Sequence, residues 1–559
     1  MLRNLPLRLA LALALILNLA AGPTMLRAQQ SPVDLPTITI RANTRLVVVD
    51  VVVTDKKGQP VTGLKAEDFT LEENGKKQKV SVFVPPGAAS QAAPTPPPPG
   101  VLSNRAENLR PAGVPTVLLL DATNSHFLDQ SYGRSQMLKY VLEQAESGKP
   151  MAVMTLTDRL HVIQNFTTDP GILTNAIKNL RPQEQILQAG AAAPASSLSG
   201  DSGGPGAGIG AALATAQAEL AGFQNLQIGY VLERRTVITI QALRDLARTL
   251  GGFSGRKNVV WLTADFPFDL IPDDRNMSDE ELMGDLPSVR QKSVTTNAAG
   301  SLAAQQRQMH GQEIRETQYQ LASAGIAIYP VDMRGIMTSG IDVNVTGALR
   351  ELAAQTGGKA YVNQNEIKDG VALAVSDEKA SYSLGYYPEN KKWDGKFRNL
   401  KVKLDRGDAE VRYRKGYFAI DPGQVKNANY ESDVAAALEL NAPATQISFR
   451  AQAKPNGPGK VQVVFLVDAG TLTAEDSGGS RKMSVTLYAS VYSSNGKNLA
   501  TRTTKVDRAF DAATYQQILD HGMMVPLDLE VPAGGQELRL AVLDNKTGFI
   551  GTVNGPLGQ

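Results

Sequence analysis

The stretch Thr116-Val-Leu-Leu-Leu-Asp121-Ala-Thr123-Asn-Ser125 decides the fold of the middle of the chain. Residues 116–120 are apolar almost without a break, which is typical of a strand that helices cover on both faces. One carboxylate and two hydroxyl groups follow at alternate positions, so in an extended turn Asp121, Thr123 and Ser125 point to one side. The stretch therefore predicts a buried central strand that ends in a cluster of oxygen atoms.

Strands and helices alternate after this stretch. Buried strands are expected at 151–156, 258–263, 326–331 and 359–362, a short antiparallel edge strand at 160–163, and helices near 130–147, 172–180, 211–223, 235–250, 305–324 and 347–355. Strands joined by helices run parallel, and such sheets bind ligands at the carboxyl ends of their strands, where Asp121, Asp265 and Asp332 are expected. The predicted fold class is α/β, a doubly wound and mostly parallel sheet over residues 112–380.

Both flanks of this region carry β-strand signals. From 40 to 84, β-branched runs alternate with Lys-Gly and Asn-Gly turn signals, which predicts a small N-terminal β domain. A Pro-rich linker is expected at 85–111, and a β extension that packs on the preceding domains at 381–420. A C-terminal β-sandwich is expected at 440–559. The α/β domain is therefore expected between antiparallel β regions.

The N-terminus has the pattern of a secretory signal peptide. Arg3 and Arg8 precede an apolar run that ends at Ala21, and Ala28 offers a cleavage site. The run of about 13 residues is shorter than the roughly 20 that a membrane-spanning helix needs. We therefore expect residues 1–28 to be removed and the mature protein to be periplasmic, on the cell surface or secreted, without a transmembrane helix.

The composition excludes several kinds of site. The chain has no Cys, which excludes disulfides, thiolate catalysis and Cys-ligated zinc. Its four His are scattered without metal-ligand spacing. Lys and Arg number 57 against 55 Asp and Glu, so no net field attracts nucleic acid.

The oxygen cluster after the first central strand suits a hard cation. A single carboxylate with two hydroxyls is the kind of donor set that Mg²⁺ accepts, since it takes few carboxylates and keeps several waters. The run resembles the metal-ion-dependent adhesion motif, Asp-x-Ser-x-Ser, of von Willebrand factor A domains. The resemblance implies metal ligands at Asp121, Thr123, Ser125 and Asp265, and an α/β domain of that type.

The chain departs from that motif in three ways. Thr123 stands in place of the first Ser, and the loop Thr of the motif has no counterpart in the Gly/Ala/Ser-rich stretch 189–210. The acidic residue that usually follows the Thr of the fourth strand is displaced by one position, because Ala264 separates Thr263 from Asp265. The alternative interpretation is that the same oxygen atoms only cap the helix that follows.

A wider resemblance covers about residues 40–420. Several motifs occur in order: Asp55-Lys-Lys-Gly-Gln-Pro-Val-Thr-Gly-Leu64, Glu73-Asn-Gly75, Leu384-Gly-Tyr-Tyr-Pro388, Gly395-Lys-Phe397 and Arg414-Lys-Gly-Tyr-Phe418. Together they resemble the VWFA-related secreted proteins of acidobacteria. That resemblance implies a fold, whereas the family's biochemical activity is unassigned.

Residues 200–205 read Gly-Asp-Ser-Gly-Gly-Pro, the nucleophile motif of chymotrypsin-like proteases. That chemistry needs a His base and an Asp orienter in a double β-barrel, whereas Ser202 lies in a low-complexity loop of an α/β domain. We therefore interpret Ser202 as a loop residue, His126 as a solvated or helix-capping side chain, and the acidic residues at 273–281 as a solvated loop.

These observations favour a binding protein over an enzyme. The first hypothesis is an exported adhesion or interaction module that binds a protein or peptide at a degenerate metal-ion-dependent adhesion site, with Mg²⁺ as the cofactor. The second is a structural or assembly component of the cell envelope with a vestigial metal site. An extracellular hydrolase is the weakest hypothesis.

Overall fold

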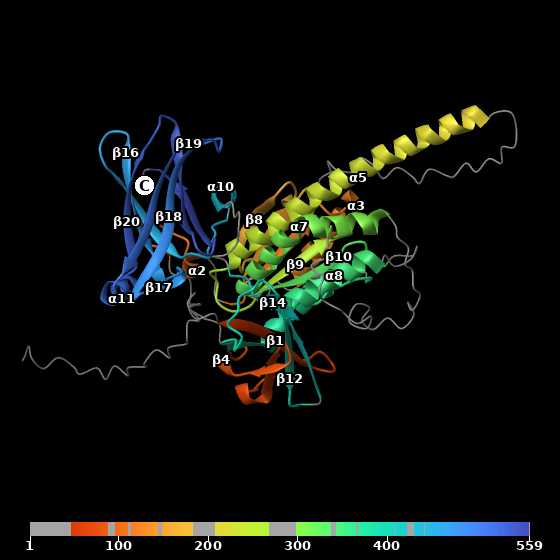
Figure 1. Cartoon of the computed structure of the whole chain (residues 1–559), viewed down its shortest axis with the longest axis horizontal. Coiled ribbons are helices and arrows are strands. Elements are labelled where there is room, and N and C mark those ends of the chain that lie inside the picture. The colour runs from red at the N-terminus through yellow and green to blue at the C-terminus, as the bar shows by residue number, and fades with distance from the viewer. Residues whose placement is uncertain are drawn as a thin grey trace, which may run out of the picture. The chain divides into compact units, whose positions relative to one another are not determined.

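The computed structural model describes residues 46–87, 96–109, 113–143, 148–182, 207–267, 298–336, 343–364, 367–406, 408–421, 430–440 and 442–557 (Figure 1). The expected signal peptide and Ser202 lie outside these ranges, as does the acidic stretch 273–281. Among the helices in these ranges, none combines the length and the apolar character needed to cross a bilayer.

The central sheet has five strands in the order β10-β9-β6-β7-β8. Its parallel strands are β6 (Thr116–Asp121), β7 (Met151–Leu156), β9 (Lys257–Thr263) and β10 (Ile326–Asp332), and β8 (Leu160–Thr167) pairs antiparallel with β7 at the edge. Every residue of β6, β9 and β10 is buried. The mixed α/β class and the antiparallel edge strand predicted from the sequence are confirmed.

Helices cover both faces of this sheet, so each strand contributes alternate side chains to two cores (Figure 1). Leu118 and Leu120 pack in one core with α3 (Phe127–Glu143), α4 (Pro170–Asn179) and α9 (Ile367–Ser376). Val117 and Leu119 pack in the other with α5 (Ala207–Leu250), α7 (Ala298–Ser323) and α8 (Val343–Thr356). The apolar run of β6 therefore has no polar face.

Two expected elements differ from the structure. The helices expected at 211–223 and 235–250 form one helix, α5, of 44 residues. No proline or helix-capping sequence separates them, and the helix ends only before Gly251-Gly252. The strand expected at 359–362 is reduced to an isolated parallel bridge between Tyr361 and Val331.

The strands that precede the α/β domain and those that directly follow it form a single β unit with one apolar core. One sheet has the order β13-β1-β11-β4 and the other β14-β12-β2-β3. Its strands are β1 (Val47–Asp55), β2 (Phe69–Glu73), β3 (Lys76–Gln78), β4 (Val80–Val84), β11 (Ser381–Tyr386), β12 (Phe397–Leu404), β13 (Ala409–Tyr413) and β14 (Gly416–Phe418), with 3-10 turns η1 (Ala66–Asp68) and η2 (Asp377–Ala380). The α/β domain is therefore inserted between β4 and β11.

The C-terminal region packs two antiparallel sheets around a second large core. The first sheet contains β5 (Val101–Ser103), β15 (Phe449–Pro455), β16 (Lys460–Val467) and β20 (Met523–Glu530). The second contains β17 (Glu475–Ser477), β18 (Ser480–Ser493), β19 (Asn498–Phe510), β21 (Gly535–Asp544) and β22 (Ile550–Pro556). Short helices α2 (Ala106–Leu109), α10 (Tyr430–Glu439) and α11 (Ala512–His521) and the turn η4 (Ala469–Thr471) complete the described elements.

The segment 85–111, expected as a linker, supplies strand β5 to this sandwich. The Asn104 side chain secures it, because its Nδ2 donates to the carbonyls of Ala444 and Ile447 at 2.7 and 2.8 Å. Its Oδ1 accepts from the Phe449 backbone N at 2.8 Å. A three-residue strand has too little periodicity to be recognised in the sequence, so only its partners reveal it.

Candidate functional site

Asp121 ends β6 with a side chain that is 0% exposed. Its Oδ1 accepts from the Asn124 backbone N at 2.9 Å. Its Oδ2 accepts from Asn124 Nδ2 and Trp261 Nε1, both at 2.9 Å, and from Thr263 Oγ1 at 3.0 Å. Burial raises the pKa of Asp121, and the hydrogen bonds from Asn124, Trp261 and Thr263 act in the opposite direction. All these donors are neutral.

The two hydroxyl groups of the motif connect the loop to neighbouring strand ends. Thr123 Oγ1 donates to the backbone carbonyl of Thr157, which follows β7. Ser125 Oγ accepts from the backbone N of Ala264, which follows β9, at 2.9 Å. From α3, the fully buried Gln130 donates to the Ser125 carbonyl at 2.9 Å. The loop is therefore fixed from three elements.

An arginine completes the network from α5. Arg235 Nε donates to Asn124 Oδ1 at 2.8 Å, and its Nη2 donates to Asp265 Oδ2 at 2.7 Å. The Arg235 side chain is 18% exposed and that of Asp265 36%. The contacts form a continuous chain from the buried Asp121 through Asn124 and Arg235 to Asp265 at the surface.

The structure brings the four predicted site residues to one edge of the central sheet but gives them different partners. The side chains of Asp121 and Asp265 are linked through Asn124 and Arg235, and the Thr263 hydroxyl lies between Asp121 Oδ2 and the Asp265 carbonyl. Ser125 contacts the loop after β9, whereas Thr123 bonds to the loop after β7, on the opposite side of β6. Their roles as metal ligands stay a prediction.

Sequence reasoning missed two residues of the network, Asn124 and Arg235. Asn124 occupies one of the unspecified positions of the motif. The only signal in the sequence was a side-chain amide, which can both donate and accept hydrogen bonds, next to Thr123 and Ser125. Arg235 lies 111 residues further along the chain in a helix with other charged residues. No local pattern distinguishes Arg235 from its neighbour Arg234.

The donor set in this arrangement does not fit Mg²⁺. Asp121 Oδ2 faces the Asn124 amide, the Trp261 indole N–H and the Thr263 hydroxyl, and Oδ1 accepts from the Asn124 backbone N, so the carboxylate is directed to donors of the protein. The Ser125 hydroxyl accepts from a backbone N–H, and the guanidinium of Arg235 lies within the network. Within the described ranges, no three His, Asp or Glu side chains gather closely enough to hold a metal ion.

Large apolar side chains are exposed beside this network. Phe127 and Leu128, the first residues of α3, are 47% and 78% exposed, and Ile336, shortly after β10, is 54% exposed. Gly133 brings α3 against the end of β10, because a Cβ there would lie 2.1 Å from Met333 Sδ. We call Phe127, Leu128 and Ile336 the rim patch. It lies at the carboxyl edge of the sheet.

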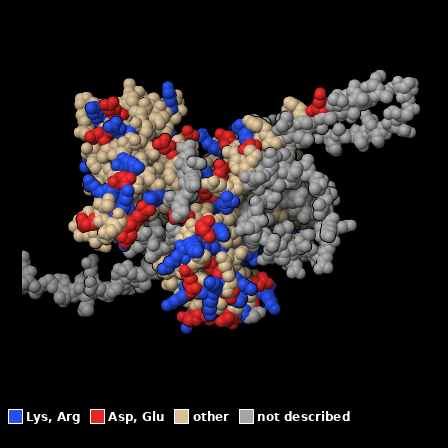
Figure 2. All heavy atoms as spheres, in the orientation of Figure 1, with Lys and Arg blue, Asp and Glu red and all other residues tan. Residues whose placement is uncertain are grey.

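Charged groups of both signs accompany the rim patch. Arg334 donates to both carboxylate oxygens of Asp332, at 3.0 and 2.8 Å. Burial raises the pKa of Asp129, and the charge of His126 acts in the opposite direction. Figure 2 shows Lys and Arg interspersed with Asp and Glu over the described surface turned to the viewer. This mixture does not favour a polyanion as the partner.

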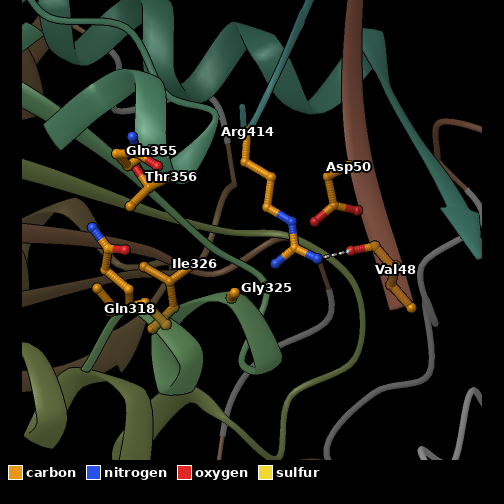
Figure 3. Close-up of a pocket in the computed structure, with 10 residues that line it drawn as sticks. Val48, Asp50, Gln318, Gly325, Ile326, Gln355, Thr356 and Arg414 are labelled. Atoms are coloured by element: carbon orange, nitrogen blue, oxygen red, sulfur yellow. Dashed lines mark hydrogen bonds between the residues drawn. The ribbon is translucent and has the colours of Figure 1, made fainter. Parts of the chain in front are cut away.

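A second candidate site is a small pocket of about 30 Å³ between the β unit and the α/β domain (Figure 3). The buried Arg414 reaches into it, donates from Nη2 to the Val48 carbonyl at 2.9 Å and lies beside Asp50, while its Nε has no hydrogen-bond partner. Organic ligands need pockets of roughly 300 Å³ or more, whereas about 15 Å³ is enough for a water molecule. This pocket is therefore too small for an organic substrate.

No family model matches the sequence, and no curated protein matches it. Solved structures that are similar include proximal thread matrix protein 1 of the mussel byssus, with 9% identity over 48% of each chain and a TM-score of 0.24. The von Willebrand factor domain of the pilus tip protein Mfa5 from Porphyromonas gingivalis has 10% identity over 47% of this chain and 94% of that one, with a TM-score of 0.22. The pilus adhesin SpaC from Lactobacillus rhamnosus GG has 9% identity over 88% and 71%, with a TM-score of 0.25. The chain spans about half the length of the mussel protein, and TM-scores this low support no conclusion about its role.

Proposed function

We propose that the chain is an exported, non-enzymatic interaction module that binds a protein through the carboxyl edge of its central sheet. The observation that carries this proposal is the exposure of Phe127 and Leu128 directly after the buried loop 121–125. Exposed apolar side chains grouped on a surface are typical of protein-binding sites. Aromatic anchors in particular contribute most of the affinity at such sites.

The rigidity of the loop supports a recognition role. Asp121, Asn124 and Ser125 are almost completely buried, and each accepts or donates hydrogen bonds to other elements. A surface that is ordered before binding avoids the entropy cost of ordering during binding. Phe127 and Leu128 of the rim patch therefore follow a loop that is already ordered before a partner binds.

Export is part of the proposal and rests on the N-terminal pattern, with Arg3, Arg8 and the apolar run before Ala28. The proposed role is also non-catalytic. The polar groups of the network are hydrogen-bonded to one another, which suits a structural support for a binding face.

A matched pair of variants tests the rim patch. The mature protein is immobilised and its binding to envelope proteins of the source bacterium is measured, after which the retained protein is identified and titrated. Phe127→Ser with Leu128→Ser should weaken the affinity by about tenfold or more, because hot-spot truncations cost more than about 1 kcal/mol. Leu142→Ser is the control, because Leu142 is 60% exposed at the other end of α3. Equal affinities for the two variants would contradict the proposal.

The second candidate is a structural component of the envelope whose metal site is vestigial. The engagement of the Asp121 carboxylate by Asn124, Trp261 and Thr263 favours it. In that case the β regions make the contacts, so the double rim variant retains full envelope association. The same titration therefore separates the two candidates.

A further inference from the structure

Two carboxylates lie at this edge of the sheet, Asp121 at the end of β6 and Asp265 after β9, and Arg235 supplies a cation from the protein itself. Asp121 is buried and has only neutral donors, and Asp265 lies at the surface end of the same network. The guanidinium of Arg235 is bonded to Asp265 directly and to Asp121 through the Asn124 amide. The cation therefore contacts Asp265 directly, and one intervening amide links it to Asp121.

The helix that carries this cation is docked on the loop by two residues one turn apart. Arg235 and Thr239 lie on the same face of α5. Asn124 Nδ2 donates to Thr239 Oγ1 at 3.0 Å, while Asn124 Oδ1 accepts from Arg235 at 2.8 Å. Both ends of the Asn124 amide are therefore engaged by α5, and the position of the guanidinium is determined by the helix.

We propose that the Arg235 guanidinium takes the place of a divalent cation in this loop, so that the site is stabilised by a built-in cation and is independent of metal. This inference concerns the loop itself and does not depend on what the rim patch binds. A loop stabilised by a metal ion and a loop stabilised by an arginine lose their structure under different treatments. Chelation disrupts the first, and substitution of one side chain disrupts the second.

Asn124 Oδ1 and Asp265 Oδ2 both accept hydrogen bonds from one guanidinium. Mg²⁺ needs oxygen ligands at about 2.0–2.1 Å in octahedral geometry. A guanidinium is a planar fork that joins two acceptors across its own width, here at 2.8 and 2.7 Å. Ala264 sets Asp265 one position further from Thr263, and its backbone N–H engages the Ser125 hydroxyl. The Ser125 hydroxyl therefore accepts a hydrogen bond from the backbone.

Thermal unfolding of the mature protein in chelator and in excess Mg²⁺ tests this proposal, together with calorimetric titration of Mg²⁺. The wild type should give the same Tm in both conditions and no binding heat. Arg235→Ala leaves Asp265 without its cation and Asn124 Oδ1 without its donor, so its Tm in chelator should fall by several degrees and rise again in Mg²⁺. Arg235→Lys retains the charge but not the fork, so its Tm should be intermediate and indifferent to Mg²⁺. Arg234→Ala is the control, because Arg234 is exposed on the same helix.

Two results overturn the proposal. One is a wild type that binds Mg²⁺ and gains stability from it. The other is an Arg235→Ala variant that is as stable as Arg234→Ala or that does not respond to Mg²⁺. If Arg235→Ala does not fold, the wild-type titration and the Arg235→Lys variant decide the matter.

Discussion

Two buried carboxylates, Glu73 in the β unit and Asp121 in the α/β domain, are held in different ways. Glu73 is 3% exposed and forms an ion pair with Arg398 at 3.1 Å, and it also accepts from the hydroxyls of Tyr386 and Tyr417 at 2.6 and 2.7 Å. Asp121 is 0% exposed and has neutral donors only. The comparison shows that one carboxylate pairs with a buried cation of its own sheet and reaches the facing sheet through Tyr386, whereas the other organises a surface loop.

The Glu73 cluster explains the motifs that carry the resemblance to VWFA-related proteins. Tyr386 lies in the Leu-Gly-Tyr-Tyr-Pro motif, Tyr417 in the Arg-Lys-Gly-Tyr-Phe motif, and Arg398 directly follows Gly-Lys-Phe. Burial raises the pKa of Tyr386 and of Tyr417, so both hydroxyls retain the protons that they donate to Glu73. Tyr386, Tyr417 and Arg398 of these motifs therefore stabilise the β unit.

The largest expected effect comes from breaking the ion pair. Arg398→Met leaves Glu73 as a buried charge without its cation, which costs about 3–5 kcal/mol of unfolding free energy in such pairs. Urea unfolding measures the loss, with Lys401→Met as the control because Lys401 is exposed on the same strand. The control substitution at the surface should change the unfolding free energy by no more than about 0.5 kcal/mol. Similar losses for the two variants would show that Glu73 does not depend on Arg398.

A third buried carboxylate, Asp245, adds to the comparison. It forms an ion pair with Arg248, and burial nevertheless raises its pKa. It accepts from Arg248 Nη1 and Gln241 Nε2, both at 2.9 Å. Burial raises the pKa of Asp245 to about 6. Asp245 therefore binds its proton more tightly in the folded state than in the unfolded state. The resulting stabilisation is fully present below the pKa of the unfolded state and is lost as the pH rises through about 6.

The measurement is the unfolding free energy of wild type and Asp245→Asn between about pH 4 and 6. The wild type should lose about 2 kcal/mol relative to the variant over this range, since each pKa unit corresponds to about 1.4 kcal/mol and the two pKa values lie close to the ends of the range. A difference that is constant with pH, or that grows in the other direction, would indicate that Arg248 keeps Asp245 ionised in the folded state.

The smallest effect is expected at Thr123. Thr123→Val keeps the shape of the side chain and removes only the hydroxyl that donates to the Thr157 carbonyl. The loss of one neutral hydrogen bond should cost about 1 kcal/mol, measured by urea unfolding, with no change in the response to Mg²⁺. A Mg²⁺ response that is present in the wild type and absent in Thr123→Val would instead restore Thr123 as a metal ligand.

Much of the fold follows from local patterns in the sequence. The unbroken apolar runs of β6, β9 and β10 predict strands buried on both faces, and all three lie in the central sheet. The short run at 160–163 predicts an antiparallel edge strand, which is β8. These predictions succeed because burial and periodicity are properties of neighbouring residues.

The partners of the polar residues were decided only by the tertiary structure. Glu73 and Arg398 are 325 residues apart, and Asn124 and Arg235 are 111 residues apart. A charged side chain in a helix or strand has the same local pattern whether it is exposed or paired. The sequence by itself therefore determined most strands and helices of the α/β domain and the place of Asp121 at the end of β6. The tertiary structure decided that Glu73 faces the cation of Arg398 and that Asp121 faces neutral donors, because that choice depends on contacts between distant segments and on their removal from water.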